Sequence, residues 1–138
     1  MPINKGEKAF ERFIKERDGL VYRFKDTADF KRAGAVGGGM SSNNPADYVA
    51  MMNGYTFLAE VKTTSKEKFV RSQVLNKKFQ GQAAEMVTRK GYLYMFALYI
   101  EPLGRIWLVN YNKIKESGGS LGPEELDSIC MYKQEIKI

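Results

Sequence analysis

Residues 45–62 read PADYVAMMNGYTFLAEVK, and this stretch decides the fold. Two mainly apolar runs flank Asn53-Gly54, a pair that strongly favours a β-hairpin. The reason is that a two-residue type I′ turn requires a positive φ at both central positions. The sequence therefore predicts two strands, Asp47–Met52 and Tyr55–Lys62, joined by this turn.

The predicted turn also fixes which residues face each other. Residue 52 pairs with residue 55, and counting outward in step places Asp47 directly opposite Glu60. Because side chains alternate along a strand, Lys62 shares the face of these two carboxylates. The opposite face is expected to enter the core, and it carries Tyr48, Ala50 and Met52 against Phe57, Ala59 and Val61.

Two directly opposed carboxylates point to a bound cation. Like charges at opposed positions of an antiparallel pair destabilise it, and a bridging divalent cation reverses the sign of that interaction. Mg²⁺ is typically held by one or two carboxylates, with water and phosphate completing its shell. Lys62 could then orient or deprotonate an attacking water, or neutralise developing charge. The alternative is a solvated strand face on which Glu60 and Lys62 form an ordinary ion pair.

The composition narrows the possible chemistry. The 138 residues fit one domain, and 43% are hydrophobic, so a packed core is feasible. There are no histidines and one cysteine, Cys130, which excludes histidine-dependent nucleophilic catalysis, a zinc site with histidine ligands and an intramolecular disulfide. The net charge of +6 suits a polyanionic partner such as DNA.

The sequence gives no sign of a membrane or secretory segment. No apolar run reaches the roughly 18 residues that a membrane span needs, and the N-terminus has no hydrophobic signal region. The expected setting is intracellular, in the cytoplasm of a cell or, for a viral protein, of its host.

Periodicity predicts the remaining elements and a single domain over residues 1–138. The expected order is α-β-β-β-α-β-β, which gives an α/β fold with a mixed sheet flanked by helices. Asn4 is a candidate N-cap of the first helix, and Gly19 and Gly91 are candidate helix ends. A long polar stretch, Lys25–Asn44, precedes the hairpin, and a basic connector, Thr63–Ser72, follows it. Outside the hairpin, the predicted helices and strands are Gly6–Asp18, Leu20–Phe24, Leu75–Lys90, Tyr92–Ile100, Arg105–Asn110, Tyr111–Glu116 and Pro123–Ile129.

The hairpin residues also resemble a known nuclease signature. Pro45-Ala46-Asp47 followed by Glu60-Val61-Lys62 resembles the motif of the PD-(D/E)XK nuclease superfamily, with Ala46 as an insertion between the Pro and the Asp. Phe10-Glu11-Arg12 looks like the helix-one glutamate motif of Holliday junction resolvases of the Hjc and RecU kinds. The Gly- and Ser-rich segment 33–44 is similar to their mobile loop, and residues 80–86 resemble the RecU segment that carries a glutamine.

The resemblance implies a restriction-endonuclease-like core and a homodimeric, Mg²⁺- or Mn²⁺-dependent endonuclease acting on four-way DNA junctions. It implies Glu11, Asp47, Glu60 and the Val61 carbonyl as metal ligands, with Lys62 and Gln82 also catalytic. Glu7 is the alternative to Glu11, and Gln80 to Gln82. Glu11 could instead pair with Lys15, and Gln82 could be an ordinary solvent-facing residue. The residues expected to contact DNA are Lys25, Lys31, Arg32, Ser41, Ser42, Lys66, Lys68, Arg71, Lys77 and Lys78.

Two other functions stay open on the sequence alone. One is a restriction-type or repair-type endonuclease with the same chemistry and a different DNA substrate. The other is a DNA-binding module whose carboxylates have lost catalysis.

Overall fold

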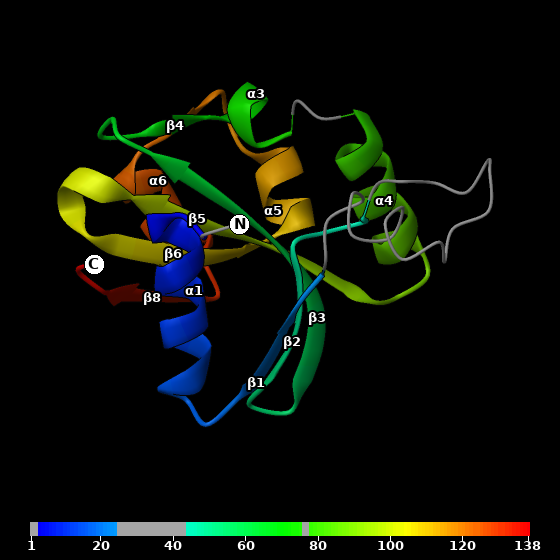
Figure 1. Ribbon diagram of the computed structural model, residues 1–138. Helices are drawn as coiled ribbons and strands as arrows, with labels where there is room; N and C mark the ends of the chain where they lie inside the picture. The colour runs from blue at the N-terminus through cyan, green and yellow to red at the C-terminus, as the bar shows by residue number, and fades with distance from the viewer. Residues whose placement is uncertain (1–2, 25–43, 76–77) are drawn as a thin grey trace, which may run out of the picture.

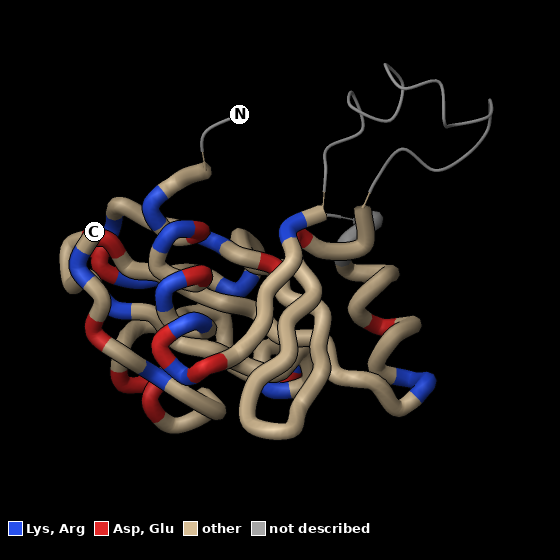
Figure 2. Tube along the Cα trace, turned by 60° about the horizontal axis from the view of Figure 1, so that its bottom comes forward, with Lys and Arg blue, Asp and Glu red and all other residues tan. Residues whose placement is uncertain are grey.

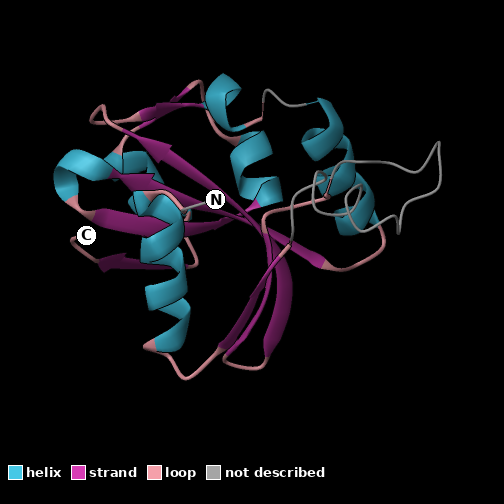
Figure 3. Ribbon diagram, in the orientation of Figure 1, coloured by secondary structure: helices cyan, strands magenta, loops and turns pink. Residues whose placement is uncertain are grey.

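The computed structural model describes residues 3–24, 44–75 and 78–138. Within these ranges a mixed six-stranded sheet has helices on both faces (Figures 1 and 3), with the strand order β1-β2-β3-β5-β6-β8. Its strands are β1 (Leu20–Arg23), β2 (Tyr48–Met52), β3 (Tyr55–Thr64), β5 (Leu93–Ile100), β6 (Arg105–Asn110) and β8 (Tyr132–Glu135). The helices are α1 (Lys5–Lys15), α3 (Arg71–Val74), α4 (Lys78–Arg89), α5 (Tyr111–Glu116) and α6 (Pro123–Ile129), with a 3₁₀ turn, η1, at Glu101–Leu103. A small second sheet pairs β4 (Phe69–Val70) with β7 (Ser120–Leu121).

The β2–β3 hairpin has the predicted register from Met52 to Tyr48, but the predicted Asp47–Glu60 pair is not part of the ladder, because the Asp47 N–H donates to the Ala59 carbonyl. Met52 pairs with Tyr55, and the ladder runs in step to Tyr48 opposite Ala59. Asn53 and Gly54 have φ values of 50° and 84°, which are the positive values that a type I′ turn requires. The local chemistry of the turn therefore sets which side chains lie on each face of the sheet.

The connection from β3 to β5 makes the sheet mixed. These two strands pair in parallel, and the chain between them passes through β4, α3 and α4. From Tyr94 to Ile100 every residue of β5 is buried, as expected for a central strand that is covered on both faces. Strand β5 thus pairs with β3 over the whole of its own length, opposite Phe57–Thr64.

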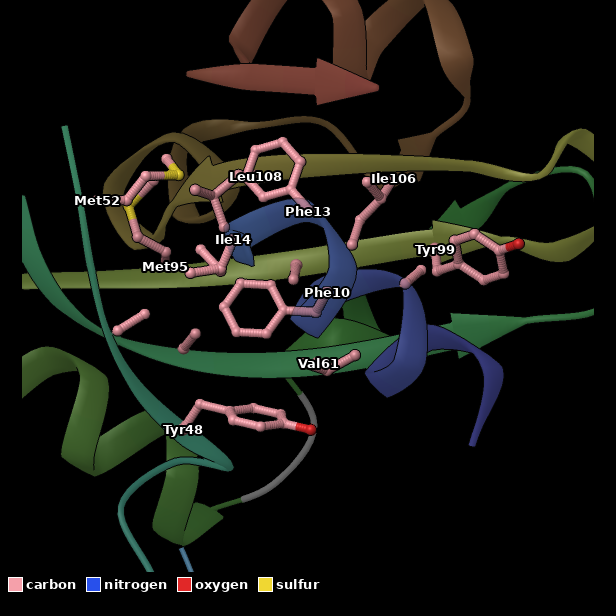
Figure 4. Close-up of a cluster of buried hydrophobic side chains, with 14 of the residues drawn as sticks. Phe10, Phe13, Ile14, Tyr48, Met52, Val61, Met95, Tyr99, Ile106 and Leu108 are labelled. Atoms are coloured by element: carbon pink, nitrogen blue, oxygen red, sulfur yellow. The ribbon is translucent and has the colours of Figure 1, made fainter. Parts of the chain in front are cut away.

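Alternation of side chains divides the interior into two cores. Helix α1 covers one face, where Phe10, Phe13 and Ile14 pack on Tyr48 and the other inward residues of the hairpin (Figure 4). All six hairpin residues predicted for the core lie in this cluster. The opposite face is covered by α3, α4, α5 and α6 and contains Trp107 and Tyr94. Each face of the sheet thus has its own helical layer.

Helix α1 begins and ends through identifiable local interactions. Asn4 is its N-cap, and Asn4 and Glu7 form a reciprocal capping box. The helix ends at Lys15, three residues before the predicted end, and the Gly19 N–H donates to the Ile14 carbonyl at 3.0 Å. A β-carbon at Gly19 would lie 2.6 Å from the Met51 carbonyl oxygen, so glycine is needed where the chain turns into β1.

The expected sheet flanked by helices is confirmed, but several element boundaries are wrong. The predicted helix Leu75–Lys90 is the single helix α4, which begins three residues later than predicted, at Lys78, and ends at Arg89. The predicted connector Thr63–Ser72 contains the end of β3, all of β4 and the start of α3. Strand β8 was not predicted, since its residues, YKQE, alternate between half-buried and exposed without an apolar pattern. In the described part of the chain, no helix is long and apolar enough to cross a membrane.

Candidate active site

Asp47 directly precedes β2, and hydrogen bonds hold both its backbone and its side chain in place. Its N–H donates to the Ala59 carbonyl at 3.1 Å, and its own carbonyl accepts from the Phe24 N–H at 2.9 Å. The ladder between β2 and β3 ends with Tyr48 opposite Ala59. The Val61 N–H, which is the next one on β3 that points toward β2, therefore has no strand carbonyl as its acceptor. The Asp47 carboxylate takes that place, and its Oδ2 accepts from the Val61 N–H at 2.9 Å. This bond fixes the carboxylate at the edge of the hairpin.

Glu60 and Lys62 stand beside Asp47 on the same side of β3. The Lys62 Nζ lies 3.6 Å from Glu60 Oε2, and the Glu60 side chain is only 4% exposed. The other carboxylate oxygen, Oε1, is buried and has no hydrogen-bond partner within the described ranges. A buried polar oxygen without a partner is costly for a fold, so this atom is a candidate metal ligand.

The two carboxylates raise each other's affinity for positive charge. Burial, and next the negative charge of Asp47, raise the pKa of Glu60 to about 8. Burial also raises the pKa of Asp47, against the opposing effects of the Val61 N–H and of Lys62. Each carboxylate disfavours ionisation of the other, and a divalent cation between them would remove that penalty. The donor set is therefore chemically suited to a hard divalent ion such as Mg²⁺.

Helix α1 brings two further carboxylates near the hairpin, and they have different surroundings. Glu11 Oε2 accepts a 2.6 Å hydrogen bond from the hydroxyl of Tyr48, on the α1 side of the sheet. Glu7 Oε2 lies 3.6 Å from Arg23 Nε, and the charge of Glu7 contributes to raising the pKa of Asp47. Among the described residues, no three carboxylates meet at one point, so a third ligand would need a side-chain rearrangement.

The close approach of α1 to β3 depends on Gly6. A β-carbon there would collide with the hydroxyl of Thr63 and would also touch Val61. Glycine is the residue that permits this contact, and it is followed directly by Glu7. The first turn of α1 therefore lies against the part of β3 that carries Lys62.

The other predicted residues are dispersed or lie outside the described part. Gln82 is exposed on α4, and Val61 is buried, with its N–H bonded to Asp47. Lys66, Lys68 and Arg71 are exposed after β3, and the Arg71 guanidinium donates to carbonyls of Lys115 and Ser117. The described ranges do not include Lys25, Lys31, Arg32, Ser41, Ser42 and Lys77, nor the side chains of Lys78 and Gln80.

The sequence prediction missed the tyrosines that surround the carboxylates. Tyr48 and Tyr94 are both fully buried, and each donates its hydroxyl to a group that flanks the site, respectively Glu11 and the Pro45 carbonyl. From the sequence they read as ordinary core aromatics. The available signal was the parallel register of β3 and β5, which cannot be read without knowing that the two strands are neighbours.

A scan of protein-family models finds no match for this sequence, and a search of curated proteins finds none either. The structure, in contrast, is similar to that of Hjc, a Holliday junction resolvase from the archaeal hyperthermophile Archaeoglobus fulgidus. The TM-score is 0.59 at 12% sequence identity, and the match covers 91% of this chain and 93% of Hjc. The similarity extends over nearly the whole of both chains, and the fold implied by the resemblance of the hairpin motif is confirmed. The chain therefore has an Hjc-like fold, a mixed sheet flanked by helices of the restriction-endonuclease-like type.

Proposed function

We propose that this protein is a metal-dependent DNA endonuclease that cuts four-way junctions. The observation that carries the proposal is the meeting of Asp47, Glu60 and Lys62 at the edge of one hairpin, with a buried Glu60 oxygen left unpartnered. The junction as substrate rests on the likeness to a Holliday junction resolvase. The charge of +6 suits DNA of any form.

Asp47 and Glu60 would hold Mg²⁺ or Mn²⁺, with the Val61 carbonyl and a carboxylate of α1 as further ligands. When bound, such an ion polarises the scissile phosphate and makes a nearby water more acidic. The chain itself positions the two carboxylates. Three hydrogen bonds with backbone groups of Ala59, Phe24 and Val61 hold Asp47, and Glu60 is held by its burial. Pre-organised carboxylates of this kind need little rearrangement on binding.

Lys62 would act on the reacting phosphate. Its side chain is 17% exposed, and its Nζ lies 3.6 Å from Glu60 Oε2. From there it can orient the attacking water and stabilise the negative charge that develops on the phosphate oxygens. Gln82, exposed on α4, would assist from the neighbouring helix.

The third carboxylate would come from Glu11 or Glu7, and we take Glu7 as the first candidate because its charge acts on Asp47. Both glutamates already have partners, Glu7 in Asn4 and Arg23 and Glu11 in the Tyr48 hydroxyl, so either would exchange a contact to bind a cation. We expect Glu7→Gln to slow cleavage by about 100-fold, and Glu11→Gln to slow it by about tenfold through a loosened Tyr48. Single-turnover cleavage rates of the two variants at saturating Mn²⁺ measure this, and the reverse ranking would return the ligand role to Glu11.

The basic residues around the site would hold the DNA backbone without reading its sequence. Lys66, Lys68 and Arg71 are exposed where the chain continues beyond β3. We propose the same role for Lys25, Lys31, Arg32, Lys77 and Lys78, and for the hydroxyls of Ser41 and Ser42.

The direct test is cleavage of matched DNA substrates. Wild type is incubated with a synthetic four-way junction, the corresponding duplex and the single strand, each with and without Mg²⁺, and Asp47→Asn is the inactive reference. We expect metal-dependent cutting of the junction in preference to the duplex. Equal rates on plain duplex would assign a restriction-type or repair-type nuclease instead. No cutting of any substrate, with DNA binding retained, would reassign the protein as a binding module.

We also propose that the protein acts as a homodimer through the outer face of β1 and β2. Leu20, Tyr22 and Met51 are 69%, 57% and 48% exposed, and the strand register places them on one face. Residues 48–59 contain no charged side chain, and Figure 2 shows this hairpin free of charge in a highly charged molecule. Apolar and aromatic residues without charges are typical of the centre of a protein interface. A two-fold pair would present two sites to the two strands that a resolvase must cut.

Oligomeric state tests this proposal independently of cleavage. We expect wild type to have the mass of a dimer by light scattering, and Met51→Glu to have the mass of a monomer because a buried unpaired charge opposes association. Met131→Glu is the matched control, since Met131 is 41% exposed elsewhere, just before β8. A monomeric wild type, or loss of the dimer in both variants alike, would contradict the assignment of this face.

A further inference from the structure

Tyr94 lies on the strand that neighbours β3, beside the candidate active site. It lies on β5, where the parallel register pairs Leu58 with Tyr94 and Glu60 with Phe96. Side chains two apart share a face, so Tyr94 points to the same side of the sheet as Glu60. Its ring is completely buried, and its hydroxyl donates a 2.5 Å hydrogen bond to the carbonyl oxygen of Pro45.

We propose that Tyr94 is a positioning residue of this active site, whose hydroxyl fixes the segment that delivers Asp47 to Glu60. This inference rests on the proposed metal-dependent function. Two further backbone bonds act at Asp47 itself, through Ala59 and Phe24. Tyr94 holds the chain two residues upstream, and the buried Ala46 lies between the two anchors.

The hydroxyl also has a particular relation to the carboxylates. Its ring lies within electrostatic reach of both, since burial first, and then the charges of Glu60 and Asp47, raise the pKa of Tyr94. The phenol therefore stays protonated and keeps its single donor on Pro45. Because the Tyr94 hydroxyl donates to the Pro45 carbonyl, it does not donate to the unpartnered Glu60 oxygen. The carboxylate remains available for a cation.

The same strand provides a matched control. Tyr99 is also buried, and its hydroxyl donates to the Ile136 carbonyl at 2.8 Å. It lies on the α1 face of the sheet, in the core with Phe13 and Ile106. Tyr94→Phe and Tyr99→Phe therefore remove the same chemical group from the same kind of bond, and one of the two bonds adjoins the carboxylates.

The experiment compares Mn²⁺ binding and thermal unfolding of wild type and both variants. We expect small losses in melting temperature in both variants, because each removes one tyrosine hydrogen bond to a backbone carbonyl. Mn²⁺ affinity by calorimetry should fall about tenfold in Tyr94→Phe and stay unchanged in Tyr99→Phe, as found when groups that support metal ligands are removed. The added stability from a fixed Mn²⁺ concentration should shrink accordingly in Tyr94→Phe.

Three other outcomes are informative. Unchanged Mn²⁺ affinity in Tyr94→Phe, or equal weakening in both variants, would overturn the positioning role while leaving the nuclease proposal intact. A wild type that binds no Mn²⁺ would overturn both. A Tyr94→Phe protein that loses far more melting temperature than Tyr99→Phe, with its Mn²⁺ affinity unchanged, would show that the hydroxyl serves stability alone.

Discussion

We expect Glu60→Gln to abolish metal-dependent cleavage and, at pH 7, to raise the free energy of unfolding by about 3 kcal/mol. The two effects would have opposite signs because, in the proposed site, the carboxylate that binds the metal is buried at the expense of stability. In the fold, burial and the charge of Asp47 raise the pKa of Glu60 from 4.5 to about 8. Gln has a similar shape but no proton to lose. The substitution therefore removes both the cost of ionising a buried carboxyl and the proposed metal ligand.

The sign of the stability effect follows from proton binding. Glu60 binds its proton more tightly in the folded than in the unfolded protein, so its contribution to stability is fully present below pH 4.5. That contribution is lost as the pH rises from about 4.5 through about 8. The advantage of Glu60→Gln should therefore be absent at pH 4 and grow through this window.

Urea unfolding at several pH values measures this, with Glu85→Gln as the control. Glu85 lies on the exposed side of α4, and hydrogen bonds from Lys115 and then Tyr111 lower its pKa. Its replacement should give no gain in stability and leave cleavage unchanged. A Glu60→Gln protein that is less stable than wild type at pH 7 would contradict the buried-carboxylate account.

The parts of the site that were predictable from the sequence are those set by short-range chemistry. The Asn53-Gly54 turn fixes the register of one hairpin, and the alternation of its side chains then separates core residues from Asp47, Glu60 and Lys62. Positive φ at two adjacent residues leaves the chain few alternatives. No knowledge of the rest of the molecule is needed for that step.

The parts that were not predictable depend on how distant elements pack. Whether Glu7 or Glu11 could serve the proposed site depends on how α1 packs against the sheet, where Gly6 contacts β3. The role of Tyr94 depends on the parallel pairing of β3 and β5, across a connection of almost thirty residues. Strand β8 has weak apolar character, and its pairing with β6 gives it its strand structure. Such features follow from tertiary packing, which local patterns do not encode.

Metal affinity should depend steeply on pH near neutrality. Because Glu60 must lose its proton to bind a cation, each pH unit below about 8 should weaken Mn²⁺ binding about tenfold. Between pH 8 and pH 6 the affinity should then fall by about 100-fold. The raised pKa of Asp47 would steepen the fall further at lower pH. Calorimetry in buffers of different ionisation enthalpy measures both the affinity and the proton released, which should approach one per ion at pH 7.

Lys62 provides the variant that separates this mechanism from a general effect of pH. Its ammonium lies 3.6 Å from Glu60 and opposes the rise in the pKa of that carboxyl. Replacement by Met removes the opposing charge, so the pKa of Glu60 should rise and the whole binding curve should move to higher pH. A charge distant from the site, such as Lys133 beside Asp127, should leave the curve in place when it is replaced in the same way. Mn²⁺ affinity that is constant from pH 6 to pH 8 would mean that Glu60 is already ionised in the fold. A vacant metal site would then no longer explain why the Glu60 Oε1 atom has no hydrogen-bond partner.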